Sequence, residues 1–192
     1  MRKIAFVAAV AAAAVSAPAF AQGPYIGLGV THENTATSGD LEGLLGVSGI
    51  GGTVLAGYSM PLSGSVFAGI EANFDLSSAK LGDNTAGFEA DNSFGVSGRL
   101  GTNLNEKTSL FGRVGYQRGR LSFTADSVKE SESFDGVRFG AGLQTAVSEK
   151  VSLRAEYSRT HYSLSKESRD DLAPEKGGYN TDQFSMAVVF GF

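Results

Sequence analysis

The feature that most constrains this chain is a period-two alternation of apolar residues with small or polar ones. Between residues 66 and 76 every even position is apolar, whereas most odd positions hold Gly or a polar residue such as Glu71 or Asp75. Successive side chains of a strand point to opposite faces, so this pattern predicts a strand with one apolar face. The alternation recurs near residues 26–31, 54–58, 94–100, 110–117, 139–143, 151–157 and 184–192, which predicts eight strands in all.

The connections between these strands alternate between short and long. The short ones are turns at residues 61–64, 103–107 and 148–150. The others are long and polar, and span about residues 31–51, 77–92, 118–135 and 162–182. Short turns on one side and long loops on the other are typical of outer-membrane barrels. We therefore expect an eight-stranded antiparallel transmembrane up-and-down β-barrel with four long extracellular loops and both termini in the periplasm.

The two faces of the predicted strands indicate which side meets lipid. The face opposite the apolar one holds many of the 26 glycines and a few charged residues. Small and charged side chains suit a narrow polar lumen, and the apolar face suits lipid. We expect opposite charges in the lumen to pair, either as a filled interior or, less favoured, as the lining of a narrow selective pore. The predicted luminal charge network is Glu71, Arg99, Arg113, Arg138, Arg154 and Glu156.

The N-terminus predicts export. Residues 1–21 have a basic start, a short apolar stretch and the small residues Ala19 and Ala21, as in a signal peptide that is removed. The barrel domain is then expected to span residues 22–192. The net charge of −4 becomes more negative when Arg2 and Lys3 leave, which argues against a nucleic-acid partner. The chain has no Cys, so disulfides do not hold this exported protein.

The final strand ends the chain in "FGF" and carries alternating apolar residues. It resembles the C-terminal signature of bacterial outer-membrane proteins, which the barrel-assembly machinery recognises. Together with "GPYIGLGV" and "LAGYSM", it makes most of the chain similar to the small outer-membrane β-barrel family of opacity-type, OmpA-like and OmpX-like proteins. The resemblance implies the bacterial outer membrane and an assembly signal formed by Phe184, Met186, Val188, Phe190 and Phe192.

One short motif suggests an alternative activity. His161 and Ser163 are expected on the lipid face near the outer rim, where a His and a Ser on one face can act as base and nucleophile. The motif resembles the His-x-Ser of outer-membrane lipid A deacylases. The resemblance implies Ser163 as nucleophile and His161 as general base, with Asp171 or Glu175 orienting the imidazole.

No cofactor or metal site is expected, since the chain has 2 His and no Cys, and Asp170-Asp171 lacks ordered ligand spacing. Our main expectation is a surface protein and not an enzyme, with a structural, envelope or adhesion role carried by its loops. Its expected partners are outer-membrane lipid, lipopolysaccharide and the barrel-assembly machinery, with a surface or host ligand that the sequence does not name. We expect a monomer.

Overall fold

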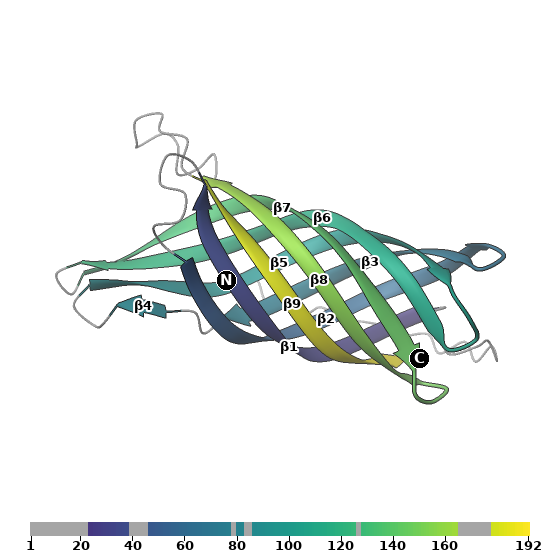
Figure 1. Ribbon diagram of the computed structural model, residues 1–192. Helices are drawn as coiled ribbons and strands as arrows, with labels where there is room; N and C mark the ends of the chain where they lie inside the picture. Colours follow the sequence, from purple (N-terminus) through teal and green to yellow (C-terminus); the bar gives the residue numbers. More distant parts are fainter. Residues whose placement is uncertain (1–22, 39–45, 78–79, 83–85, 126–127, 165–177) are drawn as a thin grey trace, which may run out of the picture.

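The computed structural model describes residues 23–38, 46–77, 80–82, 86–125, 128–164 and 178–192. This part of the chain is built from β-strands (Figure 1). Within it, no helix is long and apolar enough to cross a membrane. The strands are β1 (Gly23–Ser38), β2 (Gly46–Ser63), β3 (Val66–Ser77), β4 (Lys80–Gly82), β5 (Ala86–Asn103), β6 (Thr108–Ala125), β7 (Val128–Ala146), β8 (Val151–Leu164) and β9 (Gly178–Gly191).

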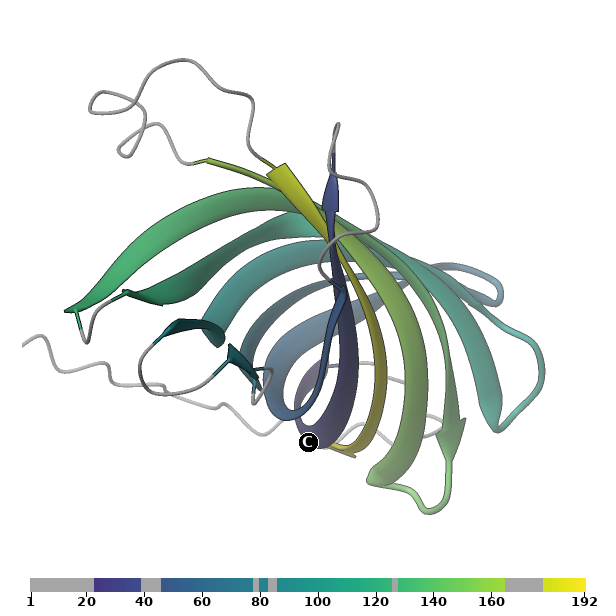
Figure 2. The same ribbon diagram turned by 60° about the vertical axis from the view of Figure 1, so that its left-hand side comes forward.

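Eight of these strands close into one antiparallel barrel, as the alternation predicted. Their order is β3-β2-β1-β9-β8-β7-β6-β5, and β5 pairs back with β3. The first and last strands are neighbours, with Tyr25 opposite Gly191. Figure 2 shows the tilted strands curving around a single lumen. The short strand β4 lies outside this closed wall and pairs only with the start of β5.

The three predicted short turns lie at one end of the barrel, and they are confirmed. They occupy residues 64–65, 104–107 and 147–150. Gly64 has a positive φ of 52°, a backbone conformation that glycine adopts without strain. In the second turn, Asn105 Oδ1 accepts hydrogen bonds from the backbone N–H groups of Lys107 and Thr108, both at 2.8 Å. The C-terminus lies at the same end, where the N–H of Phe192 donates to the carbonyl of Pro24.

The strands at the opposite end are longer than predicted, and this corrects the expected loops. Residues 118–135 were expected to form a loop, but β6 and β7 remain paired as far as Ala125 and Val128. Residues 86–90 of the second expected loop likewise belong to β5 and pair with β6. These strands extend past the barrel at the left of Figure 1. The sequence there is polar and lacks apolar periodicity, and such a pattern predicts a loop.

The outward face is apolar, as predicted. Large apolar side chains on it are strongly exposed, among them Ile70 at 66% and Val96 at 59%. In a water-soluble protein this surface would be unfavourable, whereas in a bilayer it meets hydrocarbon. The predicted signal peptide, residues 1–21, lies outside the described residues and remains a prediction.

Glycine on the inward face makes room for aromatic rings from neighbouring strands. A Cβ added to Gly101 would lie 2.3 Å from the ring of Phe67, and one added to Gly142 would lie 2.6 Å from the ring of Phe111. Both rings are almost fully buried. The glycines of the inward face therefore leave space for large side chains in the narrow lumen. The sequence predicted a narrow lumen but not this match between glycines and aromatic rings.

Replacing one inward and one outward glycine of β5 tests this fit. Gly101→Ala should lower the free energy of unfolding by about 1–3 kcal/mol, because the new methyl group overlaps the Phe67 ring and the carbonyl of Leu110. Gly98→Ala is the matched control, since its Cβ would lie 4.0 Å from the nearest atom. Urea unfolding in lipid vesicles, followed by circular dichroism, measures both. Equal stability of the two variants would contradict the proposed fit.

Candidate functional site

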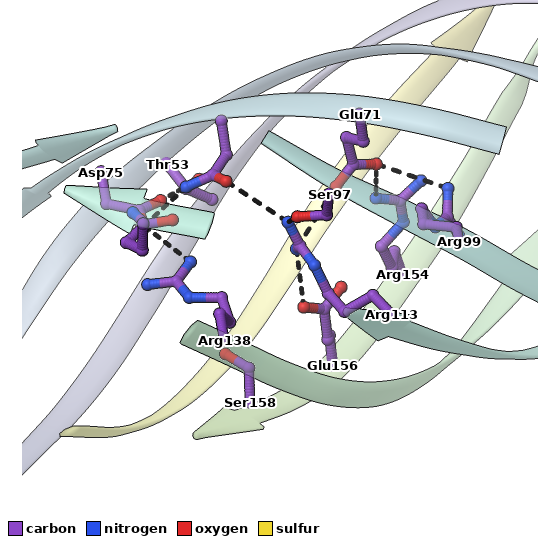
Figure 3. Close-up of polar contacts among 12 residues, drawn as sticks. Thr53, Glu71, Asp75, Ser97, Arg99, Arg113, Arg138, Arg154, Glu156 and Ser158 are labelled. Carbon is purple, nitrogen blue, oxygen red and sulfur yellow. Dashed lines mark hydrogen bonds and ion pairs between the residues drawn. The ribbon is translucent and has the colours of Figure 1, made fainter. Parts of the chain in front are cut away.

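The six charged residues predicted for the lumen are all buried inside the barrel and lie close together. They come from five strands, and Figure 3 shows their side chains converging from the wall. Glu71 is on β3, Arg99 on β5, Arg113 on β6, Arg138 on β7, and Arg154 and Glu156 on β8. All six are exposed by 8% or less. Four of the others gather around Glu71, and Arg138 belongs to a second cluster.

Glu71 is the centre of the first cluster. Its Oε2 atom accepts hydrogen bonds from Arg154 Nη1 at 2.5 Å, from the Tyr25 hydroxyl at 2.8 Å and from Arg99 Nη1 at 3.4 Å. Its Oε1 atom lies 3.3 Å from Arg113 Nη1. Three guanidinium groups therefore share one carboxylate, which is stable only because the opposite charges offset the cost of burial.

Arg99 is held partly by aromatic rings. Its guanidinium carbon lies 3.9 Å from the centroid of the Phe111 ring and 5.7 Å from that of Tyr25. Its Nε and Nη2 atoms make no hydrogen bond within the described part of the chain. Stacking on the electron-rich ring face compensates for part of this missing hydrogen bonding.

The second cluster surrounds Asp75 and is joined to the first through an amide. Asp75 Oδ2 lies 3.0 Å from Arg138 Nη1 and accepts from Asn73 Nδ2 at 2.9 Å. Asn73 Oδ1 in turn accepts from Arg113 Nη2 at 3.3 Å. Arg113 also donates to Glu156 Oε1 at 2.8 Å. Asn73 thus connects the two ion clusters into one network.

Sequence reasoning omitted several members of this network. Asp75 and Asn73 lie on the same alternating face as Glu71, so period two alone could have placed them in the lumen. The same alternation places Tyr25 on the inward face, opposite Ile26 and Leu28, but it gave no sign that the hydroxyl would join the charged network. Its hydroxyl is the group that donates to Glu71, while Arg99 Nη1 donates to it at 2.9 Å.

Apolar and aromatic side chains occupy the lumen on both sides of the charges. Near the short turns, Tyr25, Leu55, Ala187 and Val189 form a buried cluster. Towards the opposite end the Tyr162 and Tyr179 rings stack with centroids 4.6 Å apart, and Phe134 meets Tyr179 edge to face at 5.1 Å. The described lumen is therefore filled at three successive levels. This arrangement favours a packed interior over an open channel.

The buried charges balance. Among the described residues they are the arginines Arg99, Arg113, Arg138 and Arg154 and the carboxylates Glu33, Glu71, Asp75 and Glu156. The four guanidinium groups form ion pairs with Glu71, Asp75 and Glu156. Glu33, the fourth carboxylate, accepts a hydrogen bond from Gln183 Nε2 at 2.8 Å.

The proposed catalytic pair, His161 and Ser163, lies on the outward face of β8, and both side chains are exposed. Their hydrogen bonds go to different partners. His161 Nδ1 lies 2.5 Å from Asn180 Oδ1, and the Ser163 hydroxyl donates to the carbonyl of Asp135 at 3.4 Å. The structure therefore orients the imidazole but does not join it to the serine. The two candidate carboxylates, Asp171 and Glu175, lie outside the described residues.

The alternating apolar residues of the last strand lie on the lipid side of the wall. Their exposed fractions run from 36% for Val188 to 57% for Met186 and Phe192. β9 also closes the barrel against β1. Recognition by the assembly machinery remains a prediction. The residues concerned are Phe184, Met186, Val188, Phe190 and Phe192.

A closed antiparallel barrel with an apolar outer surface and a charged, filled lumen defines a small outer-membrane β-barrel protein. The sequence model of the outer membrane protein beta-barrel domain matches residues 5–192, so the chain belongs to this family and lies in the bacterial outer membrane. A 22 kDa outer membrane protein of Rhizobium leguminosarum bv. viciae is 28% identical over 183 residues, which cover 93% of this chain and 83% of the relative.

Two solved structures share the fold at low sequence identity. Neisserial surface protein A superposes with a TM-score of 0.63 at 17% identity, covering 90% of this chain and 99% of its own. The attachment invasion locus protein of Yersinia pestis, in complex with the heparin analogue sucrose octasulfate, gives 0.57 at 18% identity, covering 88% and 99%. At such identities the likeness shows the fold and no more.

The Glu71 cluster makes a direct prediction about stability. Glu71→Ala should lower the free energy of unfolding by about 3–5 kcal/mol, because three buried guanidinium groups lose their shared carboxylate. Glu106→Ala in an exposed turn is the control and should change it by less than about 0.5 kcal/mol. Urea titration in lipid vesicles, with gel mobility of unheated samples, measures the folded fraction. If both variants unfolded at the same urea concentration, Glu71 would not be the centre of the network.

Proposed function

We propose that this barrel works at the cell surface, in attachment or envelope maintenance, through the segments that extend beyond the membrane. The observation that carries the proposal is the continuation of β5, β6 and β7 past the barrel as a hydrogen-bonded sheet. Most outer-membrane barrels carry their variable functions in such extracellular segments. A paired hairpin presents its residues to a partner at a lower entropic cost than an unstructured loop would.

The filled lumen supports the same proposal. Side chains that occupy the interior at three levels leave the outside of the barrel and its extracellular end as the functional surfaces. Two proteins with this fold have names that refer to the cell surface or to attachment. They are Neisserial surface protein A and the attachment invasion locus protein of Yersinia pestis. The fold is therefore compatible with attachment, although the identity of the partner does not follow from these names.

The β6–β7 hairpin is the segment to test. Arg120 and Ser133 are cross-strand partners, so an Asn-Gly turn can join them directly and replace residues 121–132. The assay measures attachment of cells to heparin-coated or uncoated polystyrene. Cells carrying this variant should lose most of the attachment that the parent protein confers, although the barrel still folds. Attached cells are counted against cells that lack the protein.

An equivalent change at the other end of the barrel provides the control. Replacing residues 64–65 by Asn-Gly alters a short turn and should leave attachment at the parent level. Full attachment by the hairpin-replaced variant would show that the β6–β7 hairpin does not carry this role.

A second candidate function, lipid A deacylation, has one supporting observation. The His161 imidazole is oriented by Asn180 on the outward face, and a general base needs an oriented imidazole. Ser163 donates instead to a backbone carbonyl, so the pair would have to rearrange before reaction. This candidate ranks below the surface role.

Mass spectrometry of lipid A separates the two candidates. We expect the same acyl chains in cells with the parent protein, with Ser163→Ala and with no protein. Ser48→Ala, another exposed serine, is the control. Loss of an acyl chain that is reversed by Ser163→Ala alone would make the protein a lipid-modifying enzyme.

A further inference from the structure

Arg99 has hydrogen-bond donors in the lumen that no described residue accepts. Its Nη1 atom donates to Tyr25 and Glu71, but its Nε and Nη2 atoms have no hydrogen-bond partner within the described part of the chain. The Arg99 side chain is 0% exposed, so bulk water does not reach these donors. The Phe111 ring covers one face of the guanidinium, whereas the Nε–H and Nη2–H bonds lie in its plane along one edge. We call this edge the Arg99 fork.

Ser59 lies at the same level of the lumen and also has an unpartnered side chain. Ser59 of β2 is opposite Gly69 of β3, and Gly69 is opposite Arg99 of β5. A Cβ added to Gly69 would lie 2.8 Å from Ser59 Oγ, so the hydroxyl leans over Gly69 towards β5. Ser59 is 0% exposed, and its Oγ atom has no hydrogen-bond partner among the described residues. The only residue between Ser59 and Arg99 in the wall therefore has no side chain.

Tyr25 shows how far the Arg99 side chain reaches across the lumen. The Tyr25 hydroxyl lies against Gly57 of β2, and it accepts a hydrogen bond from Arg99 Nη1 at 2.9 Å. Gly57 is two residues before Ser59, so both are on the inward face of β2. The guanidinium of Arg99 is therefore held beside the part of β2 that carries Ser59.

The cluster around Glu71 has one more positive charge than negative. Three arginines in it pair with two carboxylates. An uncompensated charge is costly in a buried site, so this cluster favours the binding of one further negative charge. The arginines are Arg99, Arg113 and Arg154, and the carboxylates are Glu71 and Glu156.

The other two buried carboxylates of the described chain do not supply this charge. Asp75 lies 3.0 Å from Arg138 and is neutralised by it. Glu33 is eight residues beyond Tyr25 on β1, which places it roughly 26 Å further along the strand than the residue that contacts Arg99. The overall balance of four arginines and four carboxylates therefore includes a local excess of positive charge at the Arg99 fork.

We propose that the Arg99 fork and the Ser59 hydroxyl bind one monovalent anion, such as chloride, inside the barrel. The anion accepts hydrogen bonds from Arg99 Nε, Arg99 Nη2 and Ser59 Oγ, and it balances the excess charge of the cluster around Glu71. A water molecule accepts the same hydrogen bonds but leaves that charge uncompensated. The site involves no residue of the β6–β7 hairpin beyond the barrel, so this inference and the proposed surface role can fail separately.

Bromide diffraction tests the site directly. Crystals of the refolded parent protein are grown in sodium bromide, and anomalous scattering at the bromine absorption edge locates the bound ion. We expect an anomalous peak within hydrogen-bond distance of Arg99 Nη2 and Ser59 Oγ. The peak should be absent from Arg99→Gln, in which two arginines remain for two carboxylates. A parent map with an ordered water and no anomalous peak at the fork, or a peak that persists in Arg99→Gln, would overturn the proposal.

Unfolding in two salts tests the same site without crystals. The parent and Ser59→Ala are unfolded by urea in lipid vesicles, with chloride replaced by the much larger gluconate at constant ionic strength. Each tenfold increase in chloride above its dissociation constant should stabilise the parent by about 1.4 kcal/mol. Ser59→Ala loses one hydrogen bond to a charged group, so it should need at least about tenfold more chloride for the same stabilisation.

A second serine provides the matched control. Ser109 is also buried on the inward face, and its hydroxyl donates to the carbonyl of Gln144. Ser109→Ala should keep the chloride dependence of the parent. Equal stability of the parent in chloride and gluconate, or an unchanged chloride dependence in Ser59→Ala, would overturn the proposal. Both measurements stand even if Arg99→Gln fails to fold.

Discussion

The structure depends on a single constraint, which is that every backbone N–H and C=O within a bilayer needs a hydrogen-bond partner. A sheet satisfies this requirement only if it closes, and here the pairing of β3 with β5 completes the ring. Closure turns one face of every strand to lipid and the other to a narrow interior. The polar residues of the alternating pattern then have no place except the lumen, where eight strands leave room for little but side chains.

This crowding explains why charge and glycine occur together on the inward face. Large inward side chains such as Phe67 and Phe111 fit only where the facing position lacks a side chain. Charged residues in the remaining space cannot be hydrated as they would be in water, so each needs a partner across the lumen. Glu71 meets this need for several arginines at once, and Asn73 extends the network towards Asp75. Packing and electrostatics therefore support each other.

Period-two alternation was sufficient to predict the fold. In a barrel, the alternation that indicates a strand also separates its luminal side chains from its lipid-facing ones. The luminal position of charges such as Glu71 and Arg154 followed from the same rule. Alternation could not show which charges meet, since contacts across the lumen join strands such as β3 and β8 that are not neighbours in the wall. It also missed the extension of β6 and β7, because strands outside the bilayer no longer need an apolar face.

The pairing of opposite charges in the lumen also affects how the barrel responds to its surroundings. The four buried arginines have Glu71, Asp75 and Glu156 as their counterions inside the barrel. Pairs buried in this way are screened little by salt, whereas exposed pairs such as Arg159 and Asp182 are screened strongly. The interior and the outer wall of the same strands therefore differ in their sensitivity to ionic strength. A change in external salt concentration can therefore weaken the ion pairs of the outer wall without disturbing those inside the barrel.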